Sequence, residues 1–262
     1  MAVFTELSDE DRHAIVEAYG LTGLSSVIGI ADGDRETTYL FRSAEGEFIV
    51  TLFENGAEPL DLERAFTTME TLHRAGIPCP EPRRTVDGNA TFQAAGRLVA
   101  IVSFVSGSST SDPSPAKCRS VGRVMGQIHM SLQGGLNHQP DLPSGPVYGA
   151  LVFANVFFLG DEVSGVINFR LRHDDALIAE IADVLVDWTG GLDGGLDWRK
   201  AHVLLSGYQA IRKLSAAEKA ALPAFVLAST AKRAAALGAR RTSASECALV
   251  AYHSVTPDIF DQ

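Results

Sequence analysis

Short runs of β-branched and aromatic residues alternate with polar residues through the first third of the chain, a pattern typical of strands. Strands are predicted at 26–30, 37–42, 47–53, 89–92 and 97–105. Apolar residues at helical spacing predict a helix over 61–75, which Gly76 and Pro78 end. An acidic first turn after Ser8 predicts another helix, over 8–19. This part of the chain is therefore predicted to form a small sheet lobe.

The pattern changes to helical periodicity after 107–115, a segment rich in Ser, Pro and Gly that is the candidate hinge. Helices are predicted at 118–132, 176–188, 198–211 and 222–237. Residues 136–146 hold three prolines and are predicted to form a loop, and a hairpin that carries Asn155 and Asn168 follows. The fold class is thus α+β. The predicted domains are an N-terminal sheet lobe, 1–106, and a helical C-terminal lobe, 107–262.

Composition narrows the functional classes. The 262 residues are 46% hydrophobic, which suffices for a buried core, and the formal net charge is −10. Binding nucleic acid or an anionic membrane surface needs clustered Lys and Arg, so neither partner is expected. Three widely separated cysteines lack metal-ligand spacing and are predicted to be reduced and buried. The first residues carry acids where a signal peptide carries bases, so we expect a cytoplasmic protein.

The stretch from Tyr148 to Phe169 looks like a kinase active site whose acids are missing. Kinases carry a loop His-x-Asp-x-x-x-x-Asn, which supplies a base and a metal-binding Asn, and a later Asp-Phe, which supplies the main Mg²⁺ carboxylate. Here Tyr148 stands for the His, Ala150 for the base and Asn168 for the metal-binding Asp, while Asn155 keeps its place. No catalytic residue and no metal ligand is therefore predicted.

Several longer stretches resemble the type II homoserine kinases, members of the aminoglycoside phosphotransferase and choline kinase group. The resemblance runs in register from the first residue to about Pro223. It is carried by 1–5, 29–33, 48–54, 76–80, 155–161, 164–167 and 205–210. It implies a protein-kinase-like fold of two lobes and the transfer of the γ-phosphoryl group of ATP to homoserine.

The family pattern also assigns candidate positions for a nucleotide in the first lobe. These cofactor-binding candidates are Ile30, Thr51, Ser103, Phe104 and Val105. Relatives carry several tens of additional residues between Leu132 and Leu142, so the C-terminal lobe is expected to lack a helix before the catalytic-loop position. A second subunit, as in a homodimer, or a protein partner could cover the shortened lobe. Residues 242–262 match no part of the family.

Three classes of function remain open. The leading hypothesis is a pseudokinase that binds a small ligand or a partner in the interlobe cleft without phosphoryl transfer. The first alternative is a repurposed enzyme of specialised metabolism that uses the same cleft for other chemistry. The second is a surviving ATP-dependent small-molecule kinase, which alone requires ATP and Mg²⁺ and would recruit new metal ligands from 173–175 or Glu180. The ligand-binding candidates are Tyr148, Asn155, Asn168, Arg170 and Arg172. A structural hydrogen bond is expected for His129.

Overall fold

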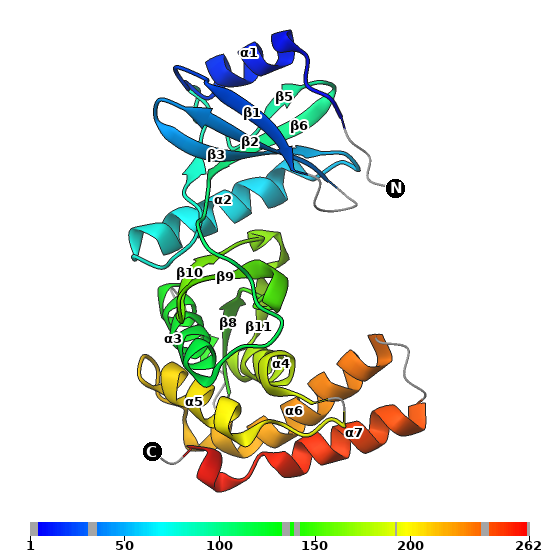
Figure 1. Ribbon diagram of the computed structural model, residues 1–262. Coiled ribbons are helices and arrows are strands. Elements are labelled where there is room, and N and C mark those ends of the chain that lie inside the picture. Colours follow the sequence, from blue (N-terminus) through cyan, green and yellow to red (C-terminus); the bar gives the residue numbers. More distant parts are fainter. Residues whose placement is uncertain are drawn as a thin grey trace. The chain divides into compact units, whose positions relative to one another are not determined.

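The computed structural model describes residues 5–30, 36–132, 137–138, 142–191, 193–236 and 241–260. The chain forms two compact units (Figure 1). The first consists of Met1–Arg74 and Cys79–Val105, and the second of Ala75–Pro78 and Ser106–Gln262. The division therefore falls between Val105 and Ser106, and the short segment Ala75–Pro78 groups with the second unit.

The first unit is an antiparallel sheet with two helices, α1 (Asp9–Ala18) and α2 (Pro59–Arg74). Its strands run in the order β1-β2-β3-β6-β4, and β5 also pairs with β6. Their bounds are β1 Ser26–Ile30, β2 Glu36–Ser43, β3 Gly46–Phe53, β4 Pro82–Arg83, β5 Phe92–Ala94 and β6 Arg97–Ser103. The predicted strands are confirmed, except that the one expected at 89–92 lies at Phe92–Ala94 and the one expected at 97–105 ends at Ser103.

Alternation along β2 explains how this sheet builds its core. Tyr39 and Phe41 are buried and alternate with half-buried neighbours, because successive side chains of a strand point to opposite faces. They pack in one cluster with Ile15 of α1 and with Tyr19, the residue that caps the C-terminus of this helix. A capping box starts α1: the Ser8 hydroxyl accepts from the Asp11 amide at 3.1 Å, and the Asp11 carboxylate accepts from the Ser8 amide at 3.1 Å.

The second unit is mainly helical, as Figure 1 shows. Its helices are α3 Pro115–Leu132, α4 Leu177–Thr189, α5 Trp198–Gln209, α6 Ala216–Ala236 and α7 Arg241–Ser254. Two small antiparallel sheets accompany them. The strands are β7 Asn137–His138, β8 Pro143–Val147, β9 Val156–Leu159, β10 Glu162–Val166 and β11 His173–Ala176. In the described residues between Leu132 and Tyr148 there is no helix. The α+β fold class is confirmed.

Helices α3 and α5 approach each other through two glycines. A Cβ atom added at Gly122 of α3 would lie 2.0 Å from the Leu204 carbonyl oxygen. One added at Gly207 of α5 would lie 2.2 Å from the Arg119 carbonyl oxygen. No side chain fits at such distances, so both positions need glycine for the helices to cross this closely.

Some segments of the second unit differ from the prediction. Residues 143–146, expected in a loop, belong to β8, and β11 pairs with this strand. The helix expected from residue 222 begins at Ala216, because Ser215 and Glu218 form a capping box. Helix α7 was not predicted at all. No helix in the described part of the chain has both the length and the apolar character needed to span a bilayer.

Candidate functional site

The loop after β8 carries three of the predicted site residues. Asn155 ends a short 3₁₀ helix, Phe153–Asn155, and its side-chain amide donates to the carbonyl of Ala150 at 3.0 Å. Ala150 itself is buried, with 3% of its surface exposed. The structure therefore holds the loop in a closed turn around Ala150, where a methyl group replaces the carboxylate that the kinase pattern requires.

Ile167 connects this loop to the segment that bears Asn168. The amide of Ile167 donates to the carbonyl of Asn155 at 3.0 Å, and its carbonyl accepts a hydrogen bond from the Tyr148 hydroxyl. The rings of Tyr148 and Phe169 lie with their centroids 4.9 Å apart. These contacts connect Tyr148 and Asn155 to Ile167 and Phe169, the two neighbours of Asn168 in the chain.

Asn168 has an unusual backbone. Its φ is 71° and its ψ is 56°, in the left-handed region, and Ala95 is the other described non-glycine residue with a positive φ. Asn tolerates this region better than most residues because its short side chain can bond locally. The side chain of Asn168 is exposed, and so are those of Arg170 and Arg172, which follow in and after the 3₁₀ helix Phe169–Leu171. Two positively charged residues therefore follow Asn168 closely in the chain.

Glu180 of α4 holds the start of the loop. Its carboxylate accepts from the Gly149 amide at 2.6 Å, from the Tyr148 amide at 3.2 Å and from the ring of His129 at 2.7 Å. Only 3% of the Glu180 side chain is exposed. Burial raises the pKa of the Tyr148 phenol well above its ordinary value, and the Glu180 carboxylate raises it further. The phenol therefore stays protonated and acts as a hydrogen-bond donor.

The same buried network continues behind His129. The other ring nitrogen of His129 lies 2.8 Å from the Tyr208 hydroxyl, which accepts from Arg212 at 3.0 Å. Arg212 is paired in turn with the buried Glu218 at 2.8 Å. The structural hydrogen bond expected for His129 is thus present. The sequence reasoning missed Tyr208 and Arg212, although Tyr208 lies in the stretch 205–210 that carried the family resemblance.

The described acids near the loop are poorly placed for a cation. Glu180 already accepts from three donors, so it has little capacity left for a metal ion. His173 and Asp175 lie on β11 with their nearest nitrogen and oxygen 3.9 Å apart. Among the described residues, no group of three or more His, Cys, Asp or Glu side chains could hold a metal ion. These observations give no geometric support to the hypothesis that a surviving kinase recruits its metal ligands from Glu180 or residues 173–175.

The cofactor-binding candidates all belong to the first unit. Ile30 ends β1, and Thr51 lies within β3 between Thr38 and Ala100 of the neighbouring strands. Ser103, Phe104 and Val105 follow one another at the end of β6.

Two amides of that last segment already have partners. The amide of Ser103 donates to the Glu81 carbonyl at 2.8 Å, and the amide of Phe104 donates to the Glu47 carbonyl at 2.9 Å. The Ser103 hydroxyl also accepts from the Glu81 amide, at 2.8 Å. A nucleotide base that used these two amides would therefore have to displace protein hydrogen bonds.

Comparison with known proteins adds sequence relatives to this picture. A sequence profile described as the phosphotransferase enzyme family matches residues 26–142. The chain is 34% identical over 266 residues to a homoserine kinase of Methylobacterium radiotolerans, with 85% of this chain and 83% of that protein covered. It is 31% identical to a homoserine kinase of Rhizobium meliloti, with 85% and 82% covered. The aligned length exceeds the whole of this chain, so these relatives carry residues that it lacks.

Solved structures agree on the fold. A microcompartment-associated aminopropanol kinase has a TM-score of 0.64 at 17% identity, with 93% of this chain and 95% of that one covered. An aminoglycoside phosphotransferase from Alicyclobacillus acidocaldarius has a TM-score of 0.69 at 10% identity, with 98% of both chains covered. At such low identity the similarity concerns the fold alone.

Proposed function

Because the chain belongs to the homoserine kinase family, which has a phosphotransferase-type fold, we propose that it is a member that has lost phosphoryl transfer and keeps ligand binding. The observation that carries this proposal is the substitution of both acids within an intact loop. Ala150 and Asn168 occupy the positions of the base and of the metal-binding Asp, and the hydrogen bonds around them still form the loop. The two acidic side chains of the kinase pattern are absent, while the loop that would carry them keeps its hydrogen bonds.

The known rate contributions of a general base and of a metal-binding carboxylate support the proposed loss of phosphoryl transfer. A general base contributes typically about 10²- to 10⁴-fold to a rate, and an alanine methyl cannot accept a proton. An amide oxygen at residue 168 binds Mg²⁺ less well than a carboxylate, because it has no charge to compete with the water ligands of the ion. Loss of both groups is expected to reduce phosphoryl transfer to near the background rate.

The ligand of this site is proposed to be a small anion, such as a phosphate ester or a nucleotide. Arg170 and Arg172 are exposed and follow Asn168 closely in the chain, and residue 168 is the position from which a kinase holds its metal ion. Guanidinium groups bind phosphate and carboxylate oxygens through charge-assisted hydrogen bonds. This ligand would need no Mg²⁺. Asn155 and Asn168 would add neutral polar contacts through their side-chain amides.

The alternative with a specific observation in its favour is a surviving kinase. The sequence relatives are named homoserine kinases, and their names favour an enzyme that transfers phosphate. A repurposed enzyme remains the other alternative, with the same polar residues in its site.

A second copy of the chain or a protein partner against the shortened second unit also stays part of the proposal, and sedimentation of the purified chain tests it.

A thermal-shift titration with turnover measurement separates these functions. ATP, ADP, phosphate and homoserine are each added with and without Mg²⁺, because a ligand that binds only the folded state raises the melting temperature. The proposal expects a shift with a phosphate-bearing ligand that does not depend on Mg²⁺, and no ADP released from ATP with homoserine. A shift with ATP that requires Mg²⁺, together with steady ADP release, would instead establish the kinase.

A further inference from the structure

Helix α7 has apolar residues on two opposite faces. Its inner face consists of Ala244, Ala248 and Ala251, which are all buried, and the helix packs along α6 (Figure 1). The opposite side carries Leu249 and Val250, with 53% and 44% of their surfaces exposed. A surface helix with one neighbour usually presents polar residues on the side that faces water. The apolar pair therefore indicates that a second partner covers this side of α7.

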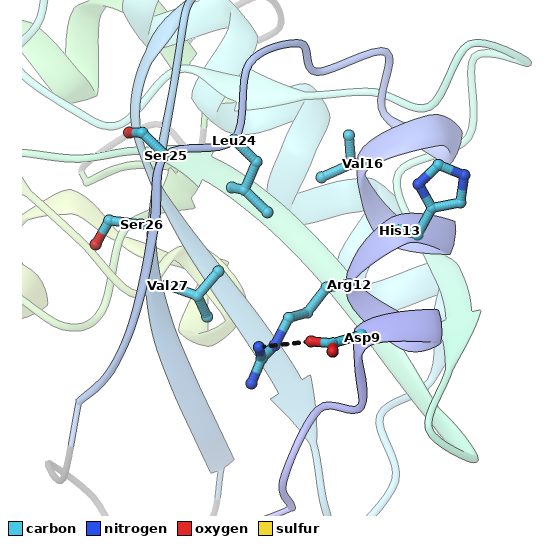
Figure 2. Close-up of a pocket in the computed structure, with 8 residues that line it drawn as sticks. All are labelled: Asp9, Arg12, His13, Val16, Leu24, Ser25, Ser26 and Val27. Atoms are coloured by element: carbon cyan, nitrogen blue, oxygen red, sulfur yellow. Dashed lines mark hydrogen bonds and ion pairs between the residues drawn. The ribbon is translucent and has the colours of Figure 1, made fainter.

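The apolar side chains at the edge of the first unit are arranged differently. Figure 2 shows Val16 of α1 opposite Leu24 and Val27 at the start of β1, with all three side chains directed toward the gap between the two elements. All three are partly buried and pack on the core of the first unit. They thus have apolar neighbours within their own unit. Leu249 and Val250, by contrast, lie on the side of α7 opposite its buried residues.

An acid and a base flank the apolar pair of α7. Glu246 lies three residues before Leu249, and His253 lies three residues after Val250. Positions 246, 249, 250 and 253 have the spacing i, i+3, i+4 and i+7, which places them on one face of a helix. Glu246 and His253 are exposed, and within the described part of the chain neither forms an ion pair. These four residues form the outer face of α7.

The outer face is symmetric about the midpoint between Leu249 and Val250. Two α7 helices that pack antiparallel about a two-fold axis through this midpoint bring Leu249 of one copy against Val250 of the other. The same axis brings Glu246 of each copy opposite His253 of the other. An imidazole ring donates an N–H to a carboxylate in its neutral form as well as in its charged form. The acid and the base are therefore complementary to a second copy of the same helix.

We propose that the outer face of α7 binds the outer face of α7 in a second copy of the chain, as an antiparallel pair. This inference rests on the second copy that the proposed function includes, and it places that copy on a helix outside the stretches that resemble homoserine kinases. A helix of 14 residues is about 21 Å long, so the interface is small. Association is therefore expected to be weak, with a dissociation constant roughly in the micromolar range or above.

Sedimentation velocity of the full-length chain, from about 1 to 500 µM, tests the association. The natural chain is expected to change from monomer to dimer over this range. A chain that stays monomeric at every concentration would overturn the proposal.

An exchange of the acid and the base tests the antiparallel pairing. Glu246→Lys and His253→Glu should each weaken association by at least about threefold, because each change removes the attractive pair at both ends of the interface. An equimolar mixture of the two variants should associate as strongly as the natural chain. In the mixed pair, the new lysine faces the new glutamate, and the natural Glu246 and His253 face each other at the other end. If the mixture associates no better than either variant alone, the antiparallel pairing is wrong.

The apolar centre of the pair is tested by Leu249→Asp. This change should weaken association by at least about thirtyfold, because it places an unpaired carboxylate at the centre of the interface in both copies. Leu159→Asp is the matched control, at a leucine of β9 that is 60% exposed, and it should leave association unchanged. Both leucines are exposed in the single chain, so both variants should keep the melting temperature of the monomer. A dimer that still forms in Leu249→Asp would contradict α7 as the interface.

These results are distinguishable from a failure of the proposed function. A dimer that forms through another surface would overturn the α7 pair and leave the loss of phosphoryl transfer as it stands. Steady release of ADP from ATP would overturn the loss of phosphoryl transfer and leave the α7 pair in place, because no residue of the loop around Ala150 takes part in it.

Discussion

The side-chain amide of Asn155 donates to the backbone carbonyl of Ala150, at 3.0 Å. This bond involves the main chain of residue 150 and not its side chain, so the bond itself does not depend on the methyl group of Ala150. The backbone at Asn168 likewise suits Asp, which also tolerates the left-handed region. The hydrogen bond to the main chain of residue 150 and the backbone conformation of residue 168 are therefore both compatible with Asp at these positions.

Restoring both acids should restore part of the chemistry. We expect the double variant Ala150→Asp, Asn168→Asp to hydrolyse ATP, in the presence of Mg²⁺, at least about 10²-fold faster than the natural chain. Hydrolysis is the better readout because the missing residues of the second unit are expected to affect the acceptor pocket. Release of ADP measures it.

The single variants are the controls for this restoration. Each should show a smaller gain than the pair, because the base and the metal ligand act on the same step. If Asn155→Ala in the double variant leaves the restored rate unchanged, the loop geometry is not the reason for the gain.

Replacement of Glu180 by Gln should destabilise the second unit. The Gln amide would face the Tyr148 and Gly149 amides with one acceptor fewer and no charge. The free energy of unfolding is expected to fall by about 2–4 kcal/mol, as when one partner of a buried charged network is removed. Urea denaturation measures it. Glu162→Gln, at a side chain that is 65% exposed, should cost no more than about 1 kcal/mol.

A methyl group at the α3–α5 crossing should be poorly tolerated. In Gly207→Ala the new Cβ would meet the Arg119 carbonyl, so the helices must move apart, and a loss of about 1–3 kcal/mol or more is expected. Gly126→Ala offers a graded comparison, because its new Cβ would lie 3.0 Å from the Ile211 side chain. Thermal denaturation should rank Gly207→Ala as the less stable variant, and the reverse order would contradict the role of the crossing.

Glu54 in the first unit predicts a dependence of stability on pH. It accepts from Thr37 at 2.6 Å and from Arg97 at 2.8 Å, and its side chain is 2% exposed. Burial acts to raise its pKa, but hydrogen bonds from Thr37, Thr5 and Arg97 outweigh this and hold the pKa at about 2, below the ordinary 4.5.

The direction of this pH dependence follows from the linkage between protonation of Glu54 and folding. A carboxyl group whose pKa is lower in the folded state contributes stability above its unfolded pKa, and this contribution is lost as the pH falls through about 4.5 toward about 2. Urea denaturation between pH 7 and pH 3 should show the decline. Glu54→Gln should flatten this slope, whereas Glu47→Gln, at an exposed ion pair, should keep it.

The cysteines offer an independent check of burial. Burial raises the pKa of Cys79 to about 12 and that of Cys118 to about 11. At pH 8 both are protonated thiols inside the protein, and thiolates are the reactive form. A disulfide reagent should therefore modify no more than one thiol, that of Cys247, in the native chain and all three after unfolding in urea.

Local patterns in the sequence predicted most of the fold. The alternation in β2 and β3 and the apolar stripes of α2, α3 and α4 depend on near neighbours, and all were placed correctly. The pairing of β8 with β11 depends instead on contact between residues such as Gly145 and Asp175, which no local pattern records. The start of α6 could have been predicted from the capping-box pattern of Ser215 and Glu218.

In the candidate site too, some residues could be predicted from a local sequence pattern and others could not. The family spacing identified Tyr148, Ala150, Asn155 and Asn168 because they form one short motif. The roles of His129, Tyr208 and Arg212 arise only when α3, α5 and the following turn meet in the core. A buried network of this kind joins residues up to 79 positions apart, so its partners cannot be recognised from spacing.

The hydrogen bonds from the Tyr148 and Gly149 amides to the Glu180 carboxylate have an evolutionary consequence. Because these bonds do not use the side chain of residue 150, an exchange of the acid at this position leaves them in place. Selection for a stable fold and selection for catalysis then act on different residues. Such a protein can survive as a folded, expressed gene product after its original reaction is no longer needed, and so remain open to a new ligand.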